Sequence, residues 1–124
     1  MGALVLFDSF DPNHLDLDWP SYLYSGNTEH RALLDYEDYL WFIRWQWRFK
    51  QSRNSPKGYL FRTIKVKVGS IWVSQNQWLH TAIMERVEPP PAPGMVVDHI
   101  DRDTMNNTRE NFRWATRREN RLNR

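Results

Sequence analysis

In the middle of the chain, apolar and polar residues alternate with the period of β-strands. The run 45–49 and the second half of the run 59–68 place apolar side chains at every second position, and the short run 71–73 is apolar throughout. Such alternation is typical of strands that bury one face. The turn-rich segment 52–58 separates the first two runs, and Gly69-Ser70 separates the second from the third. We therefore predict an antiparallel meander of three strands.

Two segments that flank this meander have the pattern of short helices. Residues 35–43 begin with acidic side chains, which the helix dipole favours in a first turn. Residues 79–87 place apolar side chains at helical spacing. The proline run at 89–91 must end this second helix, because proline lacks the amide hydrogen and restricts the residue before it.

The last thirty residues predict the order strand, strand, helix. Residues 95–100 have the pattern of a strand that is apolar up to Asp98 and His99, and residues 111–114 have the pattern of a returning strand. Thr116 and Glu119 have the Ser/Thr-x-x-Glu spacing of a capping box, which begins a helix. This unit occupies residues 95–124.

Residues 1–29 differ from the rest of the chain. They contain several turn signals and no long periodic segment, although the apolar start Ala3–Phe7 is suited to an edge strand. They hold five acidic residues and no lysine or arginine, whereas residues 31–124 hold all 17 basic residues and 10 acidic ones. A length of 124 residues predicts one domain. We expect an acidic leader at 1–29 and a single folded domain at 30–124.

The composition excludes several classes of protein. Without cysteine there are no disulfides and no Cys-containing zinc sites, so packing, including that of seven tryptophans, must hold the fold. No apolar run is long enough for a membrane span, and no basic segment precedes the short apolar start. We expect a cytoplasmic protein that does not bind membranes. The basic body suits a polyanion such as nucleic acid, although a solvated basic surface has the same composition.

Asp98 and His99 end the apolar run and directly precede a polar loop. Phosphodiester hydrolysis needs a base that activates water and a cation that spreads the developing charge. Histidine is suited to be that base near neutral pH, and a carboxylate with an amide oxygen suits Mg²⁺. Adjacent residues on a regular strand point to opposite faces, so a shared site requires the strand to end, twist or bulge here. The pair indicates a metal-dependent nuclease site.

Asp98-His99, Asn111 and Asn120, together with the sequence between them, resemble the HNH endonucleases of bacteriophages and group I introns. The resemblance covers about residues 30–124. It implies an α+β fold in which an N-terminal antiparallel β-meander with short helices packs on a C-terminal ββα-metal motif, also called a His-Me finger. It also implies that His99 is the general base, that Asp98 and Asn120 bind one Mg²⁺ or Mn²⁺ ion, and that Asn111 orients the His99 imidazole.

Arginines are frequent around this segment, and their forked donors suit the phosphates of DNA. The candidates for backbone contacts are Arg102, Arg109, Arg113, Arg117, Arg118 and Arg121. Three further residues are candidates for a supporting role. His80 also fits a capping or packing residue, Asn107 a turn residue, and Asn123 a solvated helix end.

Together with these patterns, the resemblance implies a small HNH-type endonuclease, of the phage nicking or homing kind, that cuts duplex DNA as a monomer or homodimer. Two alternatives remain open. One is a catalytically silent HNH-like scaffold that binds protein or nucleic acid, with residues 1–29 as a protein-binding arm. The other is a protein that binds or cleaves RNA.

Overall fold

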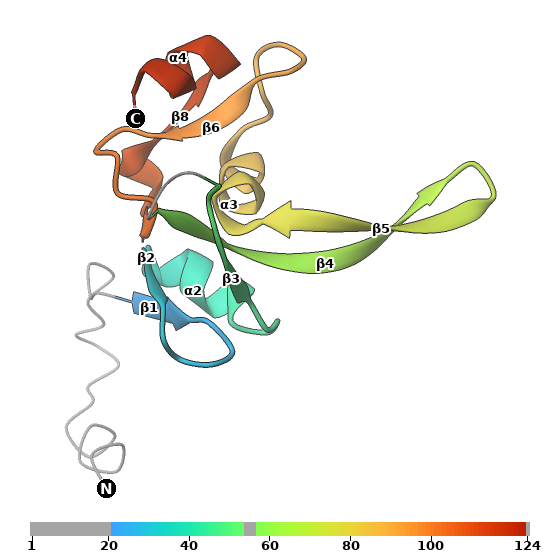
Figure 1. The fold of residues 1–124 in the computed structure, drawn as a ribbon, viewed down its shortest axis with the longest axis horizontal. Helices are drawn as coiled ribbons and strands as arrows, with labels where there is room; N and C mark the ends of the chain where they lie inside the picture. Colours follow the sequence, from blue (N-terminus) through green and yellow to red (C-terminus); the bar gives the residue numbers. More distant parts are fainter. Residues whose placement is uncertain (1–20, 54–56, 124) are drawn as a thin grey trace, which may run out of the picture.

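Three small β-sheets and three short helices make up the part of the protein that the computed structural model describes, residues 21–53 and 57–123 (Figure 1). This arrangement confirms the α+β class. The edge strand expected at Ala3–Phe7 lies outside the described residues. None of the described helices is long and apolar enough to cross a membrane.

The first sheet was not predicted and joins distant parts of the chain. Strand β1 (Ser21–Tyr24) pairs antiparallel with β2 (Arg31–Leu34), which pairs in parallel with the two-residue strand β7 (Asn106–Asn107). Leu23 of β1 is buried in the hydrophobic core. Strand β1 therefore packs into the core, although it lies within the segment expected to be a leader.

The second sheet is the predicted antiparallel meander of β3 (Arg48–Gln51), β4 (Gly58–Val68) and β5 (Ile71–Trp78). Its β4–β5 hairpin is longer than expected, and its distal half extends away from the rest of the fold (Figure 1). Trp47 was expected in this strand but precedes β3. Its ring is buried in the core, with 1% of the residue exposed, and its Nε1 donates to the Phe42 carbonyl oxygen at 2.9 Å.

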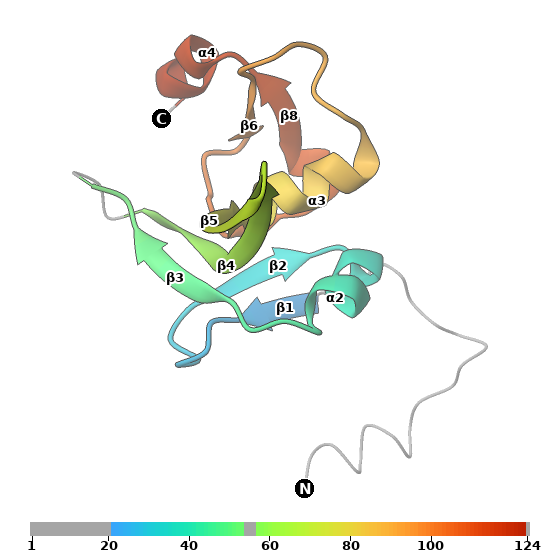
Figure 2. The same ribbon diagram turned by 90° about the vertical axis from the view of Figure 1, so that its right-hand side faces the viewer.

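The two predicted helices that flank this sheet are confirmed. They are α2 (Tyr36–Phe42) and α3 (Leu79–Val87). Helix α3 buries Leu79, Ala82, Ile83 and Met84 and lies between the second sheet and the C-terminal strands (Figure 2). The C-terminal unit packs on this helix.

The C-terminal unit has the predicted order strand, strand, helix. Strand β6 (Val96–His99) pairs antiparallel with β8 (Phe112–Ala115), and α4 (Arg117–Leu122) follows. The capping box is present: Glu119 donates its amide to Thr116 Oγ1 at 3.1 Å, and Thr116 donates its own to Glu119 Oε1 at 2.8 Å. Asn111 was expected in the returning strand but ends the short 3₁₀ turn η2 (Arg109–Asn111) before it.

A buried ion pair connects this unit to the N-terminal half of the chain. Asp38 of α2 is fully buried and accepts two hydrogen bonds from the Arg109 guanidinium, at 2.9 and 2.8 Å. The Arg109 amide also donates to Asp35 Oδ2 at 2.8 Å. The bond to Asp38 raises the pKa of Arg109. Together with the β2–β7 pairing, these contacts hold residues 106–109 against α2 and β2.

Replacing Arg109 by methionine should destabilise the fold by about 3 kcal/mol, because the Asp38 carboxylate would stay buried without its partner. Urea denaturation followed by tryptophan fluorescence measures the change in the free energy of unfolding. Arg117→Met is the control: this arginine is exposed on α4, so its loss should change the free energy by less than about 0.5 kcal/mol. Equal stability of the two variants would contradict a structural role for the Asp38–Arg109 pair.

Candidate active site

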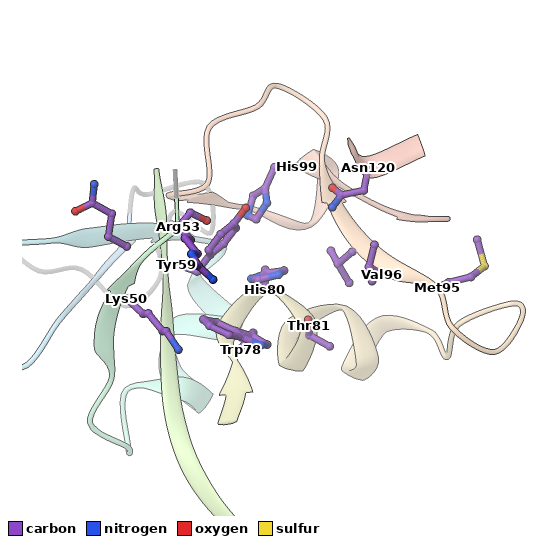
Figure 3. A pocket seen from close by; sticks show the side chains of 13 residues that line it. Lys50, Arg53, Tyr59, Trp78, His80, Thr81, Met95, Val96, His99 and Asn120 are labelled. Atoms are coloured by element: carbon purple, nitrogen blue, oxygen red, sulfur yellow. The ribbon is translucent and has the colours of Figure 1, made fainter. Parts of the chain in front are cut away.

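A pocket of about 450 Å³ lies where the second sheet, α3, β6 and α4 meet (Figure 3). His99 and Asn120 line it from the C-terminal unit. Lys50, Trp78 and His80 line it from the sheet and from the start of α3. The pocket therefore brings two of the predicted site residues together with a basic side chain of the second sheet.

The His99 imidazole is held by Asn107. His99 is 5% exposed, and its Nε2 lies 2.7 Å from Asn107 Oδ1. Asn107 is itself 1% exposed, and its backbone is fixed by pairing opposite Leu34. Because the amide oxygen accepts the hydrogen bond, Nε2 carries the proton and Nδ1 keeps its lone pair. In this tautomer, the neutral His99 imidazole can accept a proton at Nδ1.

Burial keeps both pocket histidines neutral. Desolvation lowers the pKa of His99, although the Asn107 bond and the nearby carboxylates of Asp98, Asp101 and Asp103 oppose the shift. The ring of His80 lies 5.0 Å from that of His99, centroid to centroid. Desolvation, with a smaller contribution from His99, lowers the pKa of His80 to about 3. The site therefore contains two uncharged imidazoles at neutral pH.

Asn111 contacts the loop that follows His99, and the structure places Asn107 in the position against the imidazole that was expected for Asn111. Asn111 Oδ1 accepts from the Asp101 amide at 3.0 Å, while its Nδ2 donates to Asp101 Oδ1 and to the Asn106 carbonyl oxygen, both at 2.9 Å. Partial burial opposes ionisation of Asp101, but hydrogen bonds from Asn106, from the Asp103 amide and from Asn111 lower its pKa. Asn111 thus fixes the loop from which Asn107 reaches His99.

Asp98 faces away from the pocket side of β6. Strand pairing stays regular through Asp98 and His99, so their side chains point to opposite faces. Asp98 is 2% exposed, and its Oδ2 accepts from Arg113 Nε at 2.8 Å and from Asn123 Nδ2 at 3.0 Å. Asn123 also donates to the His99 carbonyl oxygen at 3.0 Å, which ties the end of α4 to the end of β6.

The predicted metal ligands have the donor chemistry of a hard-cation site. Asp98 offers a carboxylate and Asn120 an amide oxygen, both of which suit Mg²⁺ or Mn²⁺. Among the described residues, every hydrogen bond to Asp98 falls on Oδ2, which leaves Oδ1 as an acceptor. The described part of the chain contains no group of three or more His, Cys, Asp or Glu side chains arranged around a common point. Most ligands of a bound ion would then be water and substrate oxygens.

The candidate arginines divide into two groups. Arg109, Arg113 and Arg102 make contacts within the protein, with Asp38, with Asp98 and, at 3.3 Å, with Asn123 Oδ1. The guanidinium groups of Arg117, Arg118 and Arg121 are exposed around α4 and form no ion pair with any residue that the structure describes. The positive charges of Arg117, Arg118 and Arg121 are therefore available to a ligand.

The sequence analysis did not predict the contact of Asn107 with His99 or the pair of Asp98 with Arg113. Asn107 has the sequence of a turn residue, and its burial depends on pairing with β2, more than 70 positions earlier, which no local pattern reveals. The Asp98–Arg113 pair was within reach, because the antiparallel register of β6 and β8 sets these two residues opposite each other.

His80 should make the fold less stable in acid. Its pKa of about 3 lies below the ordinary value of 6.5, so the unfolded chain binds a proton that the folded chain excludes. This contribution to stability is complete above pH 6.5 and decreases as the pH falls toward 3. When the pH is lowered from 7 to 5, the free energy of unfolding should fall in both proteins. The fall should be about 1 to 2 kcal/mol smaller in His80→Gln than in the wild type. Urea denaturation at both pH values measures this, and an NMR titration of His80 with a midpoint near 6.5 would contradict it.

Comparison with known proteins identifies the C-terminal unit. Residues 77–122, which comprise the end of β5, α3, the polar loop, both C-terminal strands and α4, match the family model of the HNH endonucleases. No curated protein and no solved structure matches the chain. The matched segment contains Asp98, His99, Asn111 and Asn120. Residues 77–122 are therefore similar to the HNH endonuclease family, in agreement with the resemblance of the sequence.

Proposed function

We propose that this protein is a divalent-metal-dependent endonuclease that hydrolyses one strand of duplex DNA, with His99 as the general base. The observation that carries the proposal is the neutral His99 imidazole, held by Asn107 at the wall of a pocket that Asn120 also lines. It lies in the segment that matches a family of nucleases. No other pocket described here is lined by a histidine of the C-terminal unit.

The proton-accepting step follows from the tautomer of His99. With Nε2–H donating to Asn107, Nδ1 takes the proton of a water molecule as the water oxygen attacks phosphorus. The P–O3′ bond breaks, leaving a 5′-phosphate and a 3′ oxygen that takes up a proton from solvent water and becomes a 3′-hydroxyl. The lowered pKa of His99 favours this role, because the imidazole is unprotonated before the reaction.

Asp98 and Asn120 are the residues that would hold the metal ion. When bound, a divalent ion supplies positive charge to the phosphate and to the departing 3′ oxygen. Arg113 and Asn123 fix the Asp98 carboxylate through Oδ2, and the capping box fixes the start of the helix that carries Asn120. These contacts support the proposal for the Asp98 carboxylate and for the backbone that carries Asn120.

The exposed arginines of α4 are suited to hold the phosphate backbone. Arg117, Arg118 and Arg121 come from the same short helix as Asn120. Charge-assisted contacts to phosphate position a duplex without reading its sequence. One pocket in one chain acts on one strand at a time, so a monomer nicks DNA.

His99→Ala should lower the rate of plasmid nicking by about 1,000-fold, because the proton acceptor is lost. The measurement is conversion of supercoiled to open-circular plasmid with Mg²⁺, Mn²⁺ or EDTA. EDTA should abolish nicking by the wild type. DNA binding by His99→Ala should remain near the wild-type affinity.

His30→Ala is the matched control, because His30 stacks on Phe49 outside the pocket. It should nick DNA at the wild-type rate. Nicking by His99→Ala as fast as by this control, or cleavage of RNA but not of duplex DNA by the wild type, would contradict the proposal.

Asn107 should act as a positioning residue for His99. Asn107→Ala removes the acceptor for Nε2–H and should lower the nicking rate by about 10- to 100-fold through misplacement of the imidazole. Asn107→Asp keeps an acceptor but adds a negative charge, which favours protonated His99. The acidic limb of its pH–rate profile should therefore move to higher pH than that of the wild type. A purely structural role for Asn107 predicts no such movement.

A further inference from the structure

One face of the second sheet carries basic and aromatic side chains along its whole length. The pairing of β3, β4 and β5 sets Arg48 opposite Phe61, Lys50 opposite Tyr59 and Lys67 opposite Trp72. Since side chains alternate along a strand, these residues share one face with Lys65, Thr63 and Trp78. We call this surface the basic sheet face and define it by Arg48, Lys50, Tyr59, Phe61, Thr63, Lys65, Lys67, Trp72, Ser74, Asn76 and Trp78.

The basic sheet face carries positive charge only. Residues 44–78, which include the whole second sheet, contain eight lysines and arginines and no aspartate or glutamate. The chain as a whole carries only two more basic than acidic residues. An acid-free stretch of this length is therefore a local concentration of charge, which favours a polyanionic partner.

This face is also the solvent-exposed face of the hairpin. Thr63, Lys65 and Lys67 are exposed, whereas Ile64 and Val66, which point to the opposite face, are partly buried. The Arg48 guanidinium lies over the Phe61 ring at 4.9 Å and donates to Thr63 Oγ1 at 2.9 Å. Its charge therefore stays on the surface of the sheet.

The basic sheet face continues directly into the active-site pocket. Lys50, Tyr59 and Trp78 belong to both. The Phe61 and Trp78 rings lie 5.6 Å apart, and those of Trp78 and Tyr59 lie 6.0 Å apart. Tyr59 is in turn 6.0 Å from the His99 ring. A row of aromatic and basic side chains thus leads from His99 out along the hairpin, and Figure 3 shows its inner end, with Lys50 and Trp78 across the pocket from Asn120.

The length of the face matches one turn of duplex DNA. Strand β4 has 11 residues, which at about 3.3 Å per residue extend about 36 Å. One turn of B-DNA is about 34 to 36 Å. The hairpin projects free of the body (Figure 1), and Trp72 near its tip is 64% exposed. A two-stranded ribbon of this kind fits along or into a groove of the duplex.

We propose that the basic sheet face is the duplex-binding arm of this protein: it holds the DNA backbone for about one helical turn to one side of the phosphate in the pocket. The proposal rests on the proposed nuclease function for the position of that phosphate. The positive charge and aromatic side chains of the face suit DNA directly. An acidic protein is the alternative partner that the experiment must exclude.

The test measures binding of the full-length protein to a fluorescent duplex of about 30 base pairs in EDTA, so that no cleavage occurs. Lys65→Gln/Lys67→Gln should bind about 50-fold more weakly at about 0.1 M salt, because two phosphate contacts are lost. The slope of log affinity against log salt should become shallower by about 2. Plasmid nicking at limiting protein should fall together with the affinity, because less DNA is bound.

Arg44→Gln/Arg86→Gln is the control with the same change in charge. These two arginines lie over the Trp41 ring, at 3.8 and 4.4 Å from its centroid, outside the second sheet. They should affect affinity and salt slope only slightly. Equal loss of binding in both double variants, or wild-type binding by Lys65→Gln/Lys67→Gln, would overturn the proposal.

Two further outcomes separate this proposal from the nuclease function. If polyglutamate competes as well as duplex DNA of equal charge, the face is an acidic-protein site and the proposal fails. If the wild type shows no metal-dependent nicking but Lys65→Gln/Lys67→Gln still loses duplex binding, the arm stands and the nuclease function fails.

Discussion

The connection between Asp38 and Arg109 is the contact on which the candidate site depends. A fully buried carboxylate is tolerated because it accepts two hydrogen bonds from a guanidinium, and losing either partner leaves an uncompensated charge. This pair and the two-residue pairing of β2 with β7 hold one loop. Asn107, which contacts the proposed general base His99, stands in that loop. The geometry of the imidazole therefore depends on α2 and β2, which lie far upstream in the sequence.

Because of this dependence, the matched segment, residues 77–122, does not contain all the residues that position His99. The segment contains the proposed chemical groups, but the residues that bury and orient them come from β2, α2 and the second sheet. Tyr59 contacts His99 from β4, and Leu34 pairs with Asn107 from β2. Burial by these neighbours removes water from both imidazoles and keeps them neutral. The same packing that stabilises the fold thus keeps His99 in the neutral form that its proposed role requires.

Charge is distributed around the pocket on two separate elements. Helix α4 presents Arg117, Arg118 and Arg121 on one side, and the second sheet presents its lysines and Arg48 on the other. The arginines beside Asp38 and Asp98 are instead neutralised within the fold. Sorting the basic residues by their partners therefore distinguishes those that hold the protein together from those whose charge is free for a phosphate backbone.

The sequence by itself determined the features that follow from local patterns. The meander, the helices 36–42 and 79–87 and the capping box at Thr116 were predictable, because periodicity and caps act over a few residues. The motif around His99 was recognisable for the same reason. Tertiary structure decided the rest: the strands β1, β2 and β7 are too short to show a period, and Asn107 became the partner of His99 only through a parallel pairing across the chain. Asp98 faces away from His99 because the strand stays regular to its end, whereas a site shared by the two residues required a twist or bulge there.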